Sequence, residues 1–328
     1  MNGESAGVAT PVLRIRDLSL SFESGSRLSR AVRDLSLELP RGAITCLAGE
    51  SGCGKSLTCK AVMRLTPENA RLSGEILFEG RDLLAISEKE LRKIRGAAIG
   101  MIFQEPMTSL NPVMKVGPQV AEPLRLHWKA SKEEAKARVL ELFRQAGIPS
   151  PEIRYNDYPH QLSGGLRQRA MIAMALTCKP RLLLADEPTT ALDATIQGQI
   201  LRLLVEERDI SGMAVLLVTH DLGVVADVGD FVGVMYAGVL VERASTKALF
   251  AKPLHPYTQG LIASSPGRAS RTLSRLPTIQ GTVPPLGQTP PGCPFQPRCS
   301  QALPVCSREF PPREILGDRE VVCWLYAR

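Results

Sequence analysis

One segment of the chain has the residue types and spacing that bind phosphate groups. Residues 49–56 read Gly-Glu-Ser-Gly-Cys-Gly-Lys-Ser, which fits the pattern G-x-x-x-x-G-K-[ST]. Glycine in such a loop lets backbone N–H groups surround phosphate oxygens, and the helix that follows presents its positive end. We expect Lys55 to reach the β- and γ-phosphates and Ser56 to bind Mg²⁺. The predicted nucleotide-binding residues of this loop are Gly49, Ser51, Gly52, Cys53, Gly54, Lys55 and Ser56.

A second segment ends in two adjacent carboxylates. Asp186 and Glu187 follow the apolar run from Leu182 to Ala185. Open α/β sheets place their chemistry at strand ends, where consecutive side chains point in different directions. Asp186 is therefore predicted to complete the Mg²⁺ site, and Glu187 to polarise the water that attacks the γ-phosphate. Together with the phosphate loop, this pair predicts nucleotide hydrolysis.

Both motifs need a strand in front of them, and the hydrophobic pattern supplies strands of that kind. Residues 182–184 and 215–218 are continuously apolar, as strands buried on both faces of a sheet must be. Helical patterns separate many of the runs, including residues 194–208 and a stretch that begins with the capping-box pair Ser131 and Glu134. This alternation predicts an α/β fold with helices on both sides of the sheet. The predicted strands are residues 13–22, 44–48, 75–78, 98–103, 181–185, 214–219 and 232–236.

Two stretches depart from this alternation. Residues from about 105 to 170 have helical periods and no convincing strand, so we predict a helical insertion. Beyond Ser265 proline becomes frequent, which disfavours sheet ladders and long helices. We therefore predict a flexible N-terminus at residues 1–10, a nucleotide-binding domain at 11–264 and an irregular Cys- and Pro-rich segment at 265–328.

Composition and charge limit the class of protein. The 328 residues are 44% hydrophobic with a net charge of +7, which excludes a wholly disordered chain. No apolar run reaches the roughly 18 residues that cross a bilayer, and the N-terminus lacks a signal-peptide pattern, so we expect a cytosolic protein. Residues 244–307 contain no Asp or Glu. This stretch is either a solvated basic surface or a site for anionic partners such as lipid headgroups, a metal cluster or nucleic acid. Nucleic acid is least favoured because aromatic residues are not interleaved.

Further motifs resemble those of the ABC-family ATPases. Residues 162–169, Leu-Ser-Gly-Gly-Leu-Arg-Gln-Arg, resemble the LSGGQ-type signature, and they precede Asp186 at the spacing of that family. Residues 191–193 resemble its D-loop. The resemblance implies a RecA-like core with an antiparallel β subdomain and a helical insertion. The residues to which it assigns roles are Gln104 as the Q-loop glutamine and a magnesium ligand, His220 as the switch histidine, Asp193 of the D-loop, Ser163, Gly164 and Gly165 of the signature, and Phe22 as the aromatic that stacks on adenine.

The signature explains why such ATPases act in pairs. Ser163 and the amides near Gly164 and Gly165 open a helix, and a helix start attracts anions. By resemblance, this helix start faces the γ-phosphate held by a second ATPase subunit, so ATP joins the two. Glu187, His220 and Gln104 are then the catalytic residues.

The end of the chain indicates the subfamily. His255-Pro256-Tyr257-Thr258, followed by a Pro- and Cys-rich segment, resembles the ATPases of peptide/nickel importers of the dipeptide/oligopeptide type. The implied partners are a paralogous ATPase subunit in a heterodimer, two membrane permease subunits and an extracytoplasmic solute-binding protein. The chain would then sit peripherally on the cytoplasmic face of the membrane and power solute uptake. A soluble ABC ATPase that acts on ribosomes or nucleic acid is the alternative, disfavoured because the chain has one phosphate loop and no sustained heptads.

Four cysteines in the C-terminal segment could bind a metal. Cys293, Cys299, Cys306 and Cys323 have the spacing C-x5-C-x6-C-x16-C, and two disulfides are disfavoured in a reducing compartment. The paired C-x2-C knuckles of zinc ribbons are absent, whereas iron–sulfur ligation tolerates irregular spacing and a neighbouring proline. Some members of the resembled subfamily carry such a cluster. We predict a [4Fe–4S] cluster, with zinc or no metal as alternatives, and expect Arg298 and Arg308, which lie within two residues of Cys299 and Cys306, to offset its negative charge.

Overall fold

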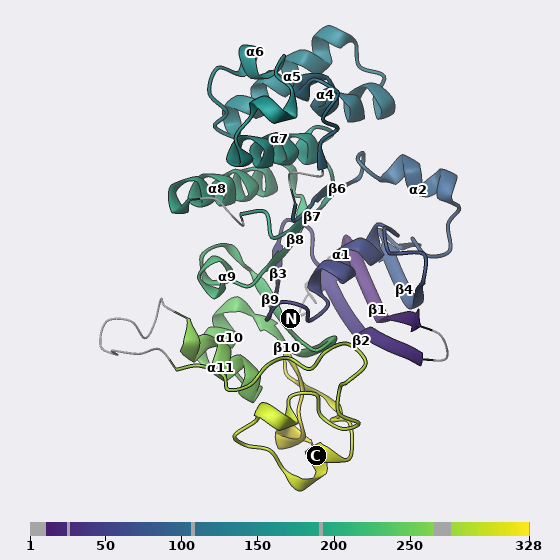
Figure 1. Ribbon diagram of the computed structural model, residues 1–328, viewed down its shortest axis with the longest axis vertical. Helices are drawn as coiled ribbons and strands as arrows, with labels where there is room; N and C mark the ends of the chain where they lie inside the picture. Colours follow the sequence, from purple (N-terminus) through teal and green to yellow (C-terminus); the bar gives the residue numbers. More distant parts are fainter. Residues whose placement is uncertain (1–10, 25–26, 106–108, 190–192, 266–276, 328) are drawn as a thin grey trace, which may run out of the picture.

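The structure is a computed structural model that describes residues 11–24, 27–105, 109–189, 193–265 and 277–327. The predicted flexible N-terminus, residues 1–10, lies outside the described residues. In the part that is described, the chain forms two sheets, a group of helices at one end and a C-terminal segment at the other (Figure 1).

The larger sheet has the strand order β11-β12-β10-β9-β3-β8-β7-β6. The strands β6, β7, β8, β3 and β9 run parallel to one another, whereas β10 pairs antiparallel with β9 and β12, and β12 pairs antiparallel with β11. The bounds are β3 Ile44–Ala48, β6 Ile99–Ile102, β7 Leu182–Asp186, β8 Ala214–Thr219, β9 Phe231–Tyr236, β10 Val239–Ser245, β11 Arg313–Leu316 and β12 Arg319–Val322. The phosphate loop follows β3 and the carboxylate pair ends β7, so both motifs lie at the carboxyl edge of the parallel strands, as predicted.

The smaller sheet is antiparallel and has the order β2-β1-β4-β5. Its strands are β1 Leu13–Ser24, β2 Arg27–Leu39, β4 Ala70–Phe78 and β5 Arg81–Asp82. β2 is absent from the strands located by pattern, although Leu35, Leu37 and Leu39 alternate and are buried. Cross-strand pairing of β1 with both β2 and β4 makes this the antiparallel subdomain that the resemblance implied.

Helices cover the larger sheet and form the end of the molecule beyond β6 (Figure 1). Their bounds are α1 Lys55–Val62, α2 Glu88–Ile94, α4 Val116–His127, α5 Lys132–Gln145, α6 Pro151–Arg154, α7 Gly164–Leu176, α8 Ala194–Ser211, α9 Leu222–Val228, α10 Thr246–Ala251 and α11 Pro256–Ser264. Short 3₁₀ turns are η1 Pro159–Gln161, η2 Gln296–Arg298, η3 Pro304–Ser307 and η4 Trp324–Tyr326. α4 to α7 fill the predicted helical region, and Ser131 and Glu134 form the predicted capping box of α5.

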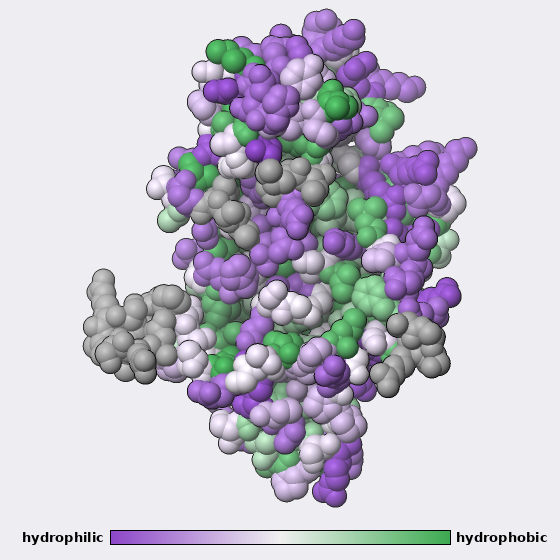
Figure 2. Space-filling model, in the orientation of Figure 1, coloured by the Kyte–Doolittle hydropathy of each residue, from purple (hydrophilic) through white to green (hydrophobic). Residues whose placement is uncertain are grey.

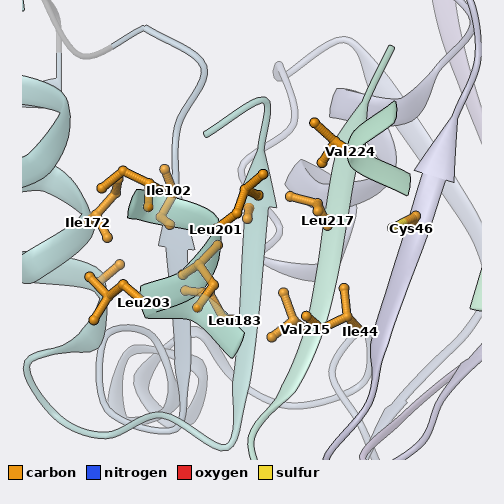
Figure 3. Packing of buried hydrophobic residues seen from close by; sticks show 14 of the residues in the cluster. Ile44, Cys46, Ile102, Ile172, Leu183, Leu201, Leu203, Val215, Leu217 and Val224 are labelled. Carbon is orange, nitrogen blue, oxygen red and sulfur yellow. The ribbon is translucent and has the colours of Figure 1, made fainter. Parts of the chain in front are cut away.

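The core lies between the larger sheet and these helices. Every residue of β3, β7 and β8 is buried, which confirms the prediction from their continuous apolar runs. In Figure 3, Leu183 of β7 lies beside Leu203 of α8, and Val215 of β8 and Ile44 of β3 follow on the neighbouring strands; all four belong to one buried cluster with Leu201. A rigid, fully covered sheet therefore fixes the loops at its carboxyl edge.

The C-terminal segment joins the main sheet instead of forming a separate irregular unit. Residues 277–312 contain no strand, as their proline content predicts, but β11 and β12 then form a hairpin. β12 pairs with β10 and so extends the larger sheet. Phe295 and Val322 of this segment are buried in the main core, so apolar packing also attaches it to the rest of the chain.

No helix among the described residues is both long enough and apolar enough to cross a membrane.

Candidate nucleotide site

The phosphate loop runs from the end of β3 to the start of α1 and is shaped by glycines. Gly49 and Gly54 have φ angles of 149° and 104°, which favour glycine. A Cβ at Gly49 would lie 2.2 Å from the carbonyl oxygen of Met235, and one at Gly54 would lie 2.8 Å from that of Ala31. Larger residues would therefore displace the loop from β9 and β2.

Lys55 lies across the loop that precedes it. Its side chain is buried, and its Nζ donates to the carbonyl oxygens of Gly49 at 2.8 Å and Glu50 at 2.9 Å. Nζ also lies 3.6 Å from Sγ of Cys53, a buried thiol whose pKa is raised mainly by burial. The ammonium group thus sits beside the backbone that the motif assigns to phosphate binding, and Cys53 is a small buried residue.

Two of the three predicted magnesium ligands are joined by a hydrogen bond. Ser56 Oγ donates to Asp186 Oδ1 at 2.8 Å, although 130 residues separate them in the chain. Asp186 is buried, and burial is the main cause that raises the pKa of its carboxyl. The hydrogen bond from Ser56 lowers this pKa, whereas the negative charge of Glu187 raises it further. A hydroxyl and a carboxylate at the foot of a phosphate loop are ligands that suit Mg²⁺.

Glu187 and His220 meet beside this pair. His220 Nδ1 lies 3.5 Å from Glu187 Oε1, and the carboxyl side chain is only 12% exposed. Glu187 has a φ of 49°, and its N–H donates to the carbonyl oxygen of Val218 at 3.1 Å. The two acids have different neighbours, because Asp186 accepts a hydrogen bond from Ser56 whereas Glu187 lies beside His220.

Two cavities open at this edge of the sheet. A cavity of about 170 Å³ is lined by Gln104, Glu187 and Leu57 and by the phosphate-loop residues Ser51, Gly52, Gly54, Lys55 and Ser56. A neighbouring cavity of about 480 Å³ is lined by Gln104 and Asp186, together with Lys60, Phe103, Glu105 and Ser109. Gln104 therefore lies near both the loop and the carboxylates, where the Q-loop resemblance placed it.

The signature residues Ser163, Gly164 and Gly165 lie at the start of α7, apart from the two cavities. Ser163 caps α7, its Oγ accepting from the N–H of Leu166 at 3.3 Å, and Gly164 and Gly165 form the first turn. Ser163 and Gly164 are exposed. Among the described residues, no signature residue lines either cavity. The helix start is thus open to contact from outside its own phosphate loop.

Two further predicted residues are placed but not joined to these cavities. Phe22 is partly buried in β1, opposite Ser29 of β2 and Ala70 of β4. Asp193 caps α8, accepting from the N–H of Ile196 at 3.0 Å. The other predicted D-loop residues, 191 and 192, lie outside the described residues.

The four cysteines of the C-terminal segment lie near one another. The N–H of Cys293 donates to the carbonyl oxygen of Cys306 at 2.8 Å. The pKa of the Cys293 thiol rises to about 11, mainly through burial and further through the thiols of Cys306, Cys323 and Cys299. Even so, no group of three or more Cys, His, Asp or Glu side chains in the described ranges is placed to hold a metal ion. This arrangement supports neither the predicted cluster nor the zinc alternative directly.

Sequence reasoning missed one contact at the phosphate loop. Arg298, which we expected to offset a metal cluster, instead forms an ion pair with Glu50, at 2.6 Å between Nη1 and Oε2. The two residues are 248 positions apart, and Glu50 occupies a variable position of the motif. Residue spacing therefore carries no signal of this contact.

The comparisons with known proteins agree with this geometry. Residues 32–190 match the family model "ABC transporter", and residues 241–306 match "Oligopeptide/dipeptide transporter, C-terminal region". A solved dimeric structure of the ATP-binding cassette MJ0796, bound to ADP and Pi, superposes with a TM-score of 0.66 and 29% identity over 71% of this chain and 98% of that one. The fold and the site therefore define an ABC ATPase cassette.

Curated relatives narrow the assignment further. A probable peptide ABC transporter ATP-binding protein of Sinorhizobium fredii is 48% identical over 99% of this chain and 98% of its own length. The dipeptide transport ATP-binding protein DppD of Bacillus subtilis is 49% identical over 96% of this chain and 94% of its own. The chain belongs to the family of ATP-binding subunits of oligopeptide/dipeptide ABC transporters. Nothing in these relatives favours the alternative of a soluble ATPase acting on ribosomes or nucleic acid.

Proposed function

We propose that this chain binds Mg-ATP at the phosphate loop and hydrolyses it to power uptake of dipeptides or oligopeptides through a separate permease. The observation that carries the proposal is the hydrogen bond between Ser56 and Asp186, 2.8 Å long, beside the loop that Lys55 spans. It gathers in one place the side chains that an ATPase needs for phosphate and for Mg²⁺. The peptide substrate class is that of the relatives' names.

Each residue near the loop has a distinct role in this proposal. Lys55 and the loop amides bind the β- and γ-phosphates, while Ser56, Asp186 and Gln104 would hold Mg²⁺. The ion, when bound, would supply positive charge that neutralises the phosphate oxygens. Glu187 orients and polarises a water, whose oxygen bonds to the γ-phosphorus as the bond to the bridging oxygen of ADP breaks. The products are ADP and inorganic phosphate, and the proton of the water passes to Glu187 or solvent.

His220 and Phe22 complete the nucleotide contacts. His220 lies on the exposed side of Glu187, 3.5 Å from its carboxylate, which suits a contact with the γ-phosphate and with the catalytic acid. Phe22 stacks on adenine in this proposal, because its flat aromatic ring can pack against the flat face of the base. Its partly buried position in β1 leaves some ring surface accessible.

A second ATPase subunit completes the site. The exposed start of α7, with Ser163, Gly164 and Gly165, would bind the γ-phosphate held by the partner's phosphate loop. Asp193 would lie at the interface between the two subunits. The dimeric form of the similar MJ0796 cassette supports this arrangement. We propose that the partner is a paralogue, so that the pair is a heterodimer.

The helical end of the molecule is the proposed contact with a cytoplasmic helix of the membrane permease, which has two subunits in this proposal. Large apolar side chains there are exposed: Val113, Leu126, Trp128 and Ile153 are between 54% and 79% accessible. Figure 2 shows isolated hydrophobic residues within a hydrophilic surface at this end. In this proposal these side chains pack against the permease, which would place the chain peripherally on the cytoplasmic face, with an extracytoplasmic binding protein delivering the solute.

Transport by the assembled complex tests the proposal. Proteoliposomes that hold this chain with its partner ATPase, permease and binding protein should accumulate a labelled oligopeptide only when Mg-ATP is present on the face that carries the ATPases. Unlabelled peptide should compete, whereas a glycoside or a nickel chelate should not. Accumulation of one of those solutes in place of peptide would contradict the substrate class, and absence of ATP hydrolysis would contradict the enzymatic role.

We also propose that Cys293, Cys299, Cys306 and Cys323 bind a [4Fe–4S] cluster. Zinc would need four sulfurs at about 2.3 Å from one point, and no described group meets the requirement for a single ion. In a [4Fe–4S] cluster each thiolate binds a different iron. The four sulfurs can therefore lie farther apart than the four sulfurs around a single zinc ion. The mutual pKa effects among these thiols support that proximity.

Metal analysis tests the cluster. Protein purified without oxygen should contain about four iron and four sulfide per chain and absorb near roughly 400 nm. Replacing Cys293 and Cys323 by Ser should remove both signals, whereas Cys178→Ser, a change at a buried core cysteine, should retain them. Zinc without sulfide, or no metal at all, would refute the proposal.

A further inference from the structure

The C-terminal segment contacts the phosphate loop at Glu50, the second residue of the loop. Arg298 of η2 donates from Nη1 to Glu50 Oε2 at 2.6 Å and from Nη2 to Oε1 at 3.0 Å. Two parallel charge-assisted bonds of this kind fix orientation as well as distance. The side chain of Arg298 is 5% exposed and that of Glu50 is 31% exposed, so solvent screens the pair only in part.

The backbone of Glu50 is held from a second direction. Its N–H donates to Oη of Tyr257 at 2.9 Å. Tyr257 is fully buried and packs against Tyr236 and Phe295, with ring centroids 4.7 and 5.3 Å away. Phe295 lies three residues before Arg298, so one turn of the C-terminal segment supplies both the aromatic packing and the guanidinium.

Arg298 has little freedom to leave Glu50. Its Nε donates to the carbonyl oxygen of Gln280 at 2.8 Å, and Nη2 also approaches that of Ile279 at 3.3 Å. Its guanidinium carbon lies 5.7 Å from the centre of the Tyr236 ring. The guanidinium is therefore positioned by the protein before any ligand binds.

Glu50 connects this contact to the proposed chemistry. Its carbonyl oxygen accepts from Nζ of Lys55 at 2.9 Å, so the residue that Arg298 holds also contacts the lysine that would bind phosphate. A carboxylate in a loop that binds a triphosphate repels its ligand unless its charge is neutralised. Arg298 supplies that neutralisation from a segment outside the nucleotide-binding motifs.

We propose that Arg298 is a positioning residue for ATP, which neutralises Glu50 and fixes the first half of the phosphate loop. The inference rests on the proposed role of that loop in binding Mg-ATP. Arg298 acts through Glu50, and its contribution is to nucleotide affinity more than to the chemical step.

A double-mutant cycle tests the coupling. Arg298→Gln should raise the Kd of the full chain for Mg-ATP about tenfold, because the negative charge of Glu50 is then uncompensated within the loop that binds the phosphates. Glu50→Gln alone should change Kd less than about threefold, and the combined variant should return to within about threefold of the wild type. Arg298→Lys, which keeps the charge but not the bidentate geometry, should give an intermediate Kd. In the assembled transporter, the KM for ATP should follow these changes while kcat stays within about threefold.

Controls separate this inference from its alternatives. Arg319→Gln breaks another ion pair of the C-terminal segment, with Glu242 at 2.9 Å, and should leave Kd unchanged. Iron content is measured in parallel because Arg298 adjoins Cys299. An unchanged Kd in Arg298→Gln, or a loss that persists undiminished in the Glu50→Gln background, overturns the inference. Failure of the wild type to bind Mg-ATP would instead overturn the proposed function.

Discussion

Replacing Glu187 by Gln should abolish steady-state ATP hydrolysis and leave ATP binding intact. Glutamine has the same shape and keeps a hydrogen-bonding oxygen, but it cannot take a proton from the attacking water. Loss of a general base costs about 10² to 10⁴ in rate. Glu187 lines the same small cavity as Lys55 and Gln104, so the effect should fall on the chemical step. Phosphate release from the assembled transporter, with the Kd for Mg-ATP measured separately, checks both halves of the expectation.

The same variant should hold two cassettes together. Without hydrolysis, ATP remains between the phosphate loop of one subunit and the signature helix of the other. The two ATPase subunits should therefore elute as a larger species in size-exclusion chromatography with Mg-ATP than with Mg-ADP. Glu23→Gln, a change at an exposed carboxylate paired with Arg71, is the control and should keep wild-type turnover. Undiminished hydrolysis by Glu187→Gln would show that another group activates the water.

Local patterns predicted the elements that carry the motifs. The strand at residues 44–48 has the predicted bounds, because a short apolar run before a glycine-rich turn leaves few other conformations. The capping box of Ser131 and Glu134 was also predicted correctly, since both of its hydrogen bonds join residues three apart. Such features depend on neighbours in the chain, and a single sequence contains that information.

Contacts between distant segments could not be predicted in this way. The pairing of β12 with β10 places the end of the chain on the main sheet, and no spacing rule indicates which strand edge is available. The contact between Arg298 and Glu50 is of the same kind, because either residue alone reads as a solvated charge. The expected link of Arg298 to a metal cluster used sequence proximity to Cys299, whereas the folded chain turns the guanidinium toward the phosphate loop.

The second large effect is expected at Lys55. Lys55→Met should weaken Mg-ATP binding by at least about tenfold, since each hydrogen bond from a charged donor to phosphate contributes about 1.5–3 kcal/mol. Methionine is a better substitution than alanine because Lys55 is buried. Its unbranched side chain fills the space of the lysine methylene groups and removes only the charged amine. Calorimetric titration of the full chain with Mg-ATP and Mg-ADP measures the change. The loss should be larger for ATP, because the ammonium group is expected to reach the γ-phosphate that ADP lacks.

A competing explanation is that Lys55 only stabilises the loop. Its Nζ donates to the carbonyl oxygens of Gly49 and Glu50, so Lys55→Met removes those bonds as well. A purely structural role predicts equal losses for ATP and ADP together with a lower melting temperature without nucleotide. Lys89→Met, at an exposed lysine of α2, controls for the change in net charge. Equal affinities of Lys55→Met and the wild type for Mg-ATP would exclude the phosphate contact, and the reading of this loop as the nucleotide site would fail with it.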